Sequence, residues 1–296
     1  MLMGAADIVP GVSGGTVAFI TGIYERLLYS LKSILPALFH FFKEREFKNF
    51  WLTINGTFLV TLFSGILLSV LSLAKLISYL LEHHPIPIWS TFFGLIVASV
   101  FVVAKEMSEW SVKLVFFALV GAISSWMITQ LTPANVEPSG LNAFFSGILA
   151  ICAMVLPGIS GSFILVMLGT YSFILSAVKE FDFIILALFA SGCLVGLLSI
   201  ANILVWMFSH YKNITLAVLT GFMVGALSKV WPWKEVLQYR EDSHGHMVAL
   251  VEKNLLPINY EIVVGEPSQT LIAVFCAITS GLLVILLTQV AIKERS

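Results

Sequence analysis

The chain has 296 residues, of which 58% are hydrophobic and only 11% are charged, and its formal net charge is −1. A soluble domain carries about 25% charged residues, so this composition excludes one, and the charge gives no reason to expect a nucleic-acid partner. Four stretches without Asp, Glu, Lys or Arg approach or exceed the roughly 20 residues of a membrane-crossing helix: 50–74, 114–136, 183–209 and 267–292. We therefore predict an all-α polytopic membrane protein.

The first element in chain order is an apolar hairpin that the segment DIVPGVSGGT, residues 7–16, interrupts. Proline removes a backbone donor and glycine relaxes the dihedral limits, so we predict a backbone break at Pro10 and Gly11. Only nine residues precede Pro10, so the first arm is expected to be short or to begin upstream of the printed sequence. Membrane helices are expected to follow at about 51–74, 88–104 and 114–131.

A second hairpin is expected in the uncharged stretch of 41 residues from 138 to 178. As one straight helix it would be about 60 Å long, twice the ~30 Å hydrocarbon core. It must turn back, and LPGISGSF (156–163) offers a break at Pro157 and Gly158. Helices are expected next at 183–208, 214–230 and 269–292. In the polar loop 233–268, residues 246–254 and 259–265 resemble two short strands.

The two hairpins are copies of one sequence. A shift of 147 positions aligns Pro10, Gly11, Ser13, Gly14, Gly22, Tyr24 and Lys32 with Pro157, Gly158, Ser160, Gly161, Gly169, Tyr171 and Lys179. We predict two halves, 1–131 and 138–296, each a broken, re-entrant hairpin plus three transmembrane helices, although fully spanning hairpin arms stay open. Three spans is an odd number, so the halves are predicted to be inverted relative to each other, as in many secondary transporters.

Basic residues orient these spans. If each hairpin returns to its own side, the loops with Lys43, Arg45, Lys48, Lys105, Lys113 and Lys212 share one face with the C-terminus. Long loops such as 233–268 count little toward orientation, and the positive-inside rule places the basic face in the cytoplasm. We therefore predict a multi-pass protein of the bacterial cytoplasmic membrane, with a cytoplasmic C-terminus and with 233–268 outside the cell.

The two breaks are predicted to form an anion site. A serine after each break can cap a new helix, whose first turn offers free N–H groups and the positive end of the helix dipole. The candidate phosphate-binding residues are Ser13, Gly14, Gly15 and Thr16, then Ser160, Gly161 and Ser162. The alternative is that these small residues serve close helix packing or cap a kink. Two matching motifs within apolar runs favour the site.

Three ionisable residues, Asp7, Glu25 and Arg26, flank the first break. Such residues in membrane segments are functional hypotheses by default, so we predict that they couple transport or pair charges. An interfacial position for Asp7 and an ordinary cytoplasmic ion pair for Glu25 and Arg26 stay open. The three scattered cysteines and the histidines match no ligand pattern, so no metal, disulfide or cofactor is expected.

The segment GAADIVPGVSGGTVAFITGIYERL (4–27), with the second P-G-x-S-G, resembles the polyprenyl-phosphate transporter (PopT-type) family of bacterial membrane proteins. The resemblance runs over essentially the whole chain. It matches the family signatures at Asp7, Pro10, Gly11, Ser13, Gly14, Gly15, Thr16, Glu25, Arg26, Pro157, Gly158, Ser160 and Gly161. It implies a flippase that returns undecaprenyl phosphate from the outer to the cytoplasmic leaflet, recycling the lipid carrier of cell-envelope synthesis.

The residues fit such a substrate independently of the resemblance. A charged head is costly in hydrocarbon, whereas a polyprenyl tail can stay in lipid. We therefore predict alternating access, with the phosphate bound between the two breaks. A channel or carrier for a small inorganic anion is the alternative. An enzyme is not expected, since no histidine lies near either break to act as a nucleophile or base. The expected partners are the lipid substrate, the bilayer and, as an open option, a second copy of the chain.

Overall fold

The computed structural model describes residues 1–8, 12–107, 109–131, 136–137, 139–241 and 247–293. The helices are α1 (Leu2–Asp7), α2 (Gly14–Ile20), α3 (Tyr24–Lys32), α4 (Ile34–Glu44), α5 (Phe47–Thr53), α6 (Gly56–His83), α7 (Pro85–Lys105), α8 (Val112–Gln130), α9 (Gly140–Val155), α10 (Gly161–Met167), α11 (Tyr171–Lys179), α12 (Phe183–Ala226), α13 (Pro257–Val264) and α14 (Thr270–Lys293). One antiparallel pair of strands, β1 (Lys234–Glu241) and β2 (Met247–Asn254), accompanies them. The predicted all-α polytopic architecture is confirmed, with this hairpin added.

Five helices in the described part of the chain are long and apolar enough to cross a membrane: α6, α7, α8, α12 and α14. With 44 residues, α12 would be about 66 Å long, twice the hydrocarbon core. Tyr211, at φ −139° and ψ 47°, interrupts its helical backbone. The two parts of α12 correspond to the spans predicted at 183–208 and 214–230.

Two of the expected elements differ from the sequence prediction. The span predicted from residue 51 begins at Gly56, because Asn55 adopts a left-handed backbone (φ 51°) and separates α5 from α6. Residues 259–265, predicted as a strand, belong mostly to α13. Pro257 lies at the start of α13, where its fixed φ suits a helix and its missing N–H costs nothing.

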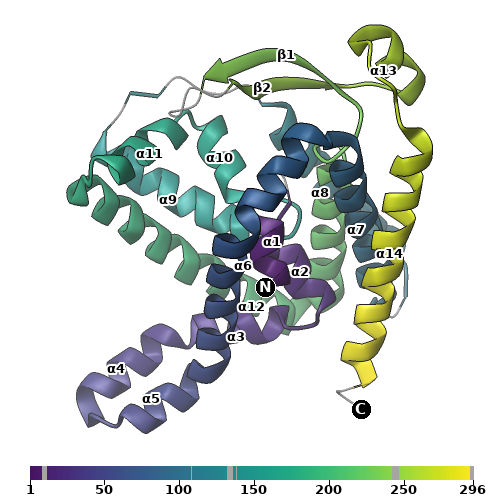
Figure 1. Ribbon diagram of the computed structural model, residues 1–296. Coiled ribbons are helices and arrows are strands. Elements are labelled where there is room, and N and C mark those ends of the chain that lie inside the picture. Colours follow the sequence, from purple (N-terminus) through teal and green to yellow (C-terminus); the bar gives the residue numbers. More distant parts are fainter. Residues whose placement is uncertain (9–11, 108, 132–135, 138, 242–246, 294–296) are drawn as a thin grey trace.

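The molecule has two distinct ends (Figure 1). The α4–α5 hairpin projects as an arm at one end, and the β1–β2 hairpin lies with α13 at the opposite end. α14 runs along the outside of the bundle, from α13 toward the end that carries the arm. We call these the arm end and the strand end.

After the break at Pro157 and Gly158, the second copy bends again, by 108°, between α10 and α11. Gly169 provides this turn with a φ of +70°, and Gly22 has a φ of +67° at the matching turn between α2 and α3. The bounds of α2 and α3 correspond to those of α10 and α11 at the same shift of 147 positions. The inverted relation of the halves stays a prediction.

The core surrounds the first hairpin. Leu28, Ile96, Leu216 and Met223 are fully buried in one cluster that joins α3, α7 and the second part of α12. The outer faces of the spans keep large apolar side chains exposed, such as Leu271 at 88%. Because no aqueous protein surface tolerates an apolar belt of this extent, we assign these faces to lipid. Residues 12–16 and 157–160, which belong to the two interrupted segments, thus lie inside a protein core that lipid surrounds.

Candidate functional site

The first break leads into what we call the first tip, residues 12–16, which is buried in the bundle. Ser13 caps α2 with an extended backbone (φ −117°, ψ 133°), and its Oγ accepts from the N–H of Gly15 at 3.1 Å. The same Oγ lies 3.0 Å from the carbonyl oxygen of Met154 and 3.1 Å from that of Leu156. The two carbonyls share its single proton. Ser13 therefore caps its own helix and ties it to the second hairpin.

Two further hydrogen bonds join the hairpins. The N–H of Gly158 donates to Thr16 Oγ1 at 3.1 Å, and the Tyr24 hydroxyl donates to the carbonyl oxygen of Val155 at 3.2 Å. Thr16 is fully buried and Tyr24 is nearly so. Gly158 has a φ of +91°, which L side chains rarely adopt. Side chains of the first hairpin thus satisfy backbone groups around the second break, namely three carbonyls and the Gly158 N–H.

Asp7 places a carboxyl group at the start of α2. Its Oδ1 accepts from the N–H of Gly14 at 2.7 Å. Its Oδ2 is buried and has no hydrogen-bond partner among the residues that the structure describes. α1 packs against the middle of α6, because Gly4 lets the two backbones meet at Ile66. Asp7 therefore lies beside the first tip, inside the bundle, and a coupling role for it stays a prediction.

The second tip, residues 156–162, is more open than the first. Ser160 is the N-cap residue of α10 but makes no capping bond with its side chain, and its Oγ lies 2.9 Å from Ser162 Oγ. Ser162 is exposed, whereas Ser160 is only 5% exposed. Met154 occupies the position that matches Asp7, so the second copy lacks that carboxylate. The hydroxyls of Ser160 and Ser162 contact each other, whereas the Ser13 hydroxyl of the first tip bonds to the opposite hairpin.

The predicted break residues differ in what can be said of them. Pro157 and Gly158 lie between α9 and α10, where the helix is interrupted. Pro10 and Gly11 fall outside the described residues. Gly15 and Gly161 allow close contacts, because an added Cβ would lie 2.6 Å from the carbonyl oxygen of Val155 and 2.7 Å from that of Ala150, respectively. Glycine at the tips thus has a packing function, whatever else it does.

Glu25 and Arg26 lie away from the tips, near the arm. Glu25 Oε1 is 3.4 Å from Lys212 Nζ, and both side chains are about half exposed. The Arg26 guanidinium lies 4.4 Å from the centre of the Phe58 ring. Exposed ion pairs contribute about 0–1 kcal/mol, so the Glu25–Lys212 contact fits an ordinary surface ion pair. The sequence had suggested Arg26, not Lys212, as the partner of Glu25. A coupling role for either residue stays a prediction.

Sequence reasoning missed a charged cluster at the strand end, formed by Lys229, Lys234 and Glu252. Glu252 Oε2 lies 2.8 Å from Lys229 Nζ and 3.3 Å from Lys234 Nζ. Lys234 Nζ also donates to the Lys229 carbonyl at 2.7 Å and lies 3.9 Å from the centre of the Trp89 ring. The signal in the sequence was two lysines five positions apart after the last long apolar run of α12.

Burial perturbs the titration of this cluster. Desolvation lowers the pKa of the Lys234 ammonium to about 8, although Glu252 opposes the shift. Burial by itself would raise the pKa of Glu252, but the ammonium groups of Lys234 and Lys229 outweigh it and hold that pKa below its ordinary value. Glu252 is therefore the one carboxylate that two lysine side chains of the cluster contact.

The comparison with known proteins agrees with the predicted family. Residues 3–248 match the model of a family described as undecaprenyl phosphate translocase-like. The chain belongs to this family. It is 48% identical over 293 residues to a polyprenyl-phosphate transporter of Vibrio cholerae serotype O1, covering 99% of this chain and 95% of the relative. It is 32% identical over 248 residues to a polyprenyl-phosphate transporter of Staphylococcus aureus, covering 78% of this chain and 83% of the relative. No solved structure matches the chain significantly.

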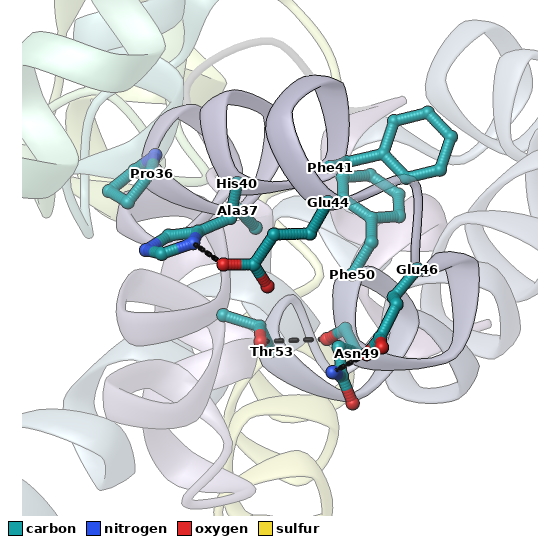
Figure 2. Close-up of a pocket in the computed structure, with 9 residues that line it drawn as sticks. All are labelled: Pro36, Ala37, His40, Phe41, Glu44, Glu46, Asn49, Phe50 and Thr53. Atoms are coloured by element: carbon teal, nitrogen blue, oxygen red, sulfur yellow. Dashed lines mark hydrogen bonds and ion pairs between the residues drawn. The ribbon is translucent and has the colours of Figure 1, made fainter.

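The translocase-like chain also has a hollow that is separate from the tips (Figure 2). It lies between α4 and α5 and is lined by Pro36, Ala37, His40, Phe41, Glu44, Glu46, Asn49, Phe50 and Thr53. His40 and Glu44 point toward each other, with 3.5 Å between Nδ1 and Oε1. All of its walls belong to the arm, so it does not connect the two tips. Among the described residues, no group of three or more His, Cys, Asp or Glu side chains could hold a metal ion.

Proposed function

We propose that this protein is a flippase that moves undecaprenyl phosphate from the outer to the cytoplasmic leaflet, so that the lipid carrier of cell-envelope synthesis is recycled. The family match and the names of the two relatives support this substrate class. The observation that carries the mechanism is the contact of the first tip with the second hairpin in the core, where Ser13 and Thr16 bond to backbone groups of that hairpin. Broken helices near the centre of a repeated fold are where secondary transporters bind their substrates.

In our proposal, the phosphate binds between the two tips. The hydroxyls of Ser160 and Ser162 make no capping bonds, and Gly161 is the first residue of α10. Separation of the tips would release Ser13 Oγ, Thr16 Oγ1 and the Gly158 N–H, which are donors or acceptors of the kind that phosphate needs. The described arrangement, in which these groups are paired with each other, then corresponds to a state without substrate. The halves 1–131 and 138–296 would rock against each other to expose the site to either face.

The proposal also states how the protein is oriented in the membrane and that it is a transporter, not an enzyme. The arm end carries Lys43, Arg45 and Lys48, so it is assigned to the cytoplasm together with the C-terminus, and the strand end is assigned to the outside. The protein would act in the bacterial cytoplasmic membrane without catalysing a covalent reaction. The head would cross through the core, and the tail would stay in lipid between the halves.

The test is crossing of undecaprenyl phosphate in proteoliposomes loaded in one leaflet. We expect fast crossing with the wild type and a loss of about tenfold or more with Ser160→Ala/Ser162→Ala, since each hydroxyl bond to an anion contributes about 1.5–3 kcal/mol. Ser191→Ala/Ser199→Ala is the matched control, because those hydroxyls bond only to carbonyls of their own helix. No crossing above empty liposomes, with permeation by small anions, would support the channel alternative instead.

A further inference from the structure

Lys229 lies at the edge of the second tip. Its Nζ is 5.1 Å from the centre of the Phe163 ring, and Phe163 directly follows Ser162 in the first turn of α10. The Lys229 side chain is 19% exposed, so it is partly covered but still reachable. An ammonium group therefore stands beside the exposed hydroxyl-bearing segment of the second hairpin, on its strand-end side.

The turn that carries Lys229 is held from several sides. The Lys229 carbonyl accepts from Lys234 Nζ at 2.7 Å. The neighbouring Ser228 accepts from Asn254 Nδ2 at its carbonyl (2.7 Å), and its Oγ lies 3.1 Å from Thr129 Oγ1. These bonds join α8, the turn after α12 and β2. The backbone position of Lys229 is thus fixed before a ligand binds, so the entropic cost of ordering this turn on binding is small.

The charges of the cluster do not balance. Two ammonium groups share one carboxylate oxygen, and the exposed fractions of the three side chains are only 19% for Lys229, 6% for Lys234 and 17% for Glu252. Lys234 directs its ammonium to the Lys229 carbonyl, to Glu252 and to the face of Trp89. Lys229 Nζ has one hydrogen bond to a described residue, Glu252, and lies near the Phe163 ring of α10, so not all of its three N–H donors are used by the described residues. A surplus positive charge with little water around it favours an anionic ligand.

We propose that Lys229 is a docking cation for a phosphate monoester head, on the way between the strand end and the second tip. Lys234 holds the turn that carries Lys229, Glu252 offsets part of the charge, and Ser162 takes over the phosphate from Lys229. This inference rests on the proposed function and adds a residue outside both tips. On the proposed topology, the lipid phosphate meets Lys229 first when it enters from the outer leaflet.

The test is a titration of the purified full-length chain with farnesyl phosphate and, separately, with inorganic phosphate, followed by calorimetry. Lys229→Gln is expected to weaken farnesyl phosphate binding by about tenfold or more, and Lys229→Arg to keep binding within about threefold. Glu252→Gln removes the carboxylate but keeps both ammonium groups, so it is expected to bind more tightly than the wild type. Lys75→Gln, which removes an exposed charge from α6, is the matched control and is expected to bind like the wild type.

The outcomes separate the two proposals. Wild-type binding of farnesyl phosphate that Lys229→Gln leaves unchanged would overturn the docking role alone. Equal losses in Lys229→Gln and Glu252→Gln would also overturn it, because an ion pair with a purely structural role predicts that result. Binding of inorganic phosphate alone, dependent on Lys229, would retain the cation site and reject the lipid substrate. A wild type that binds neither compound would reject both proposals. If Lys229→Gln does not fold, Glu252→Gln decides the question: tighter binding of farnesyl phosphate than by the wild type would support the docking role, and binding that is unchanged or weaker would overturn it.

Discussion

The hydrogen bond from the Gly158 N–H to Thr16 Oγ1 can be removed with almost no change of side-chain shape, by Thr16→Val. The bond is 3.1 Å long and Thr16 is fully buried, so water cannot replace the lost acceptor. The variant would leave a buried backbone N–H unsatisfied, at a cost of about 1–3 kcal/mol. Since about 1 kcal/mol changes the unfolding temperature of a large domain by roughly 2 °C, we expect a decrease of about 2–6 °C.

The assay is thermal unfolding of the purified chain in detergent, with two comparison variants. Thr16→Ser keeps the acceptor and should recover most of the loss. Thr91→Val removes a hydroxyl that bonds only to the Pro87 carbonyl of its own helix, so its effect should be much smaller. If Thr16→Val unfolds within about 1 °C of the wild type, or if Thr91→Val loses as much, the contact between the hairpins does not have the energy assigned to it here.

Three other predictions follow from the same contacts. Gly15→Ala should lower the unfolding temperature, because its Cβ would lie 2.6 Å from a backbone oxygen, whereas Gly281→Ala meets nothing closer than 3.5 Å; equal unfolding temperatures would contradict the close packing of the tips. The pKa of Lys234 is lowered to about 8 from 10.5, so between these values the unfolded chain binds more protons and stability rises with pH. The unfolding temperature of the wild type should therefore rise relative to that of Lys234→Met across this window, and parallel curves would refute the assignment. If Asp7 couples transport to protons, loss of the proton gradient should slow the wild type but not Asp7→Asn, and equal slowing would exclude coupling.

The local features of the fold were predictable from the sequence. Pro157 and Gly158 predicted the break between α9 and α10, because proline lacks an N–H and only glycine tolerates the φ of +91° found at Gly158. Ser13 and Ser160 were expected at helix starts, and both are N-cap residues. The strand predicted at 259–265 was wrong, since alternating apolar residues in a short segment do not distinguish a strand from one or two helical turns.

The amino-acid sequence alone shows one-dimensional patterns: apolar runs long enough to span a bilayer, their polar interruptions, and the repeat at 147 positions. The partners of the backbone groups at these interruptions are visible only in the folded chain. Ser13 bonds to carbonyls more than 140 positions away, and Glu252 neutralises part of the charge of Lys229 from 23 positions away. Periodicity carries no information on such pairs, because a broken backbone in a core that excludes water must find partners wherever packing brings them.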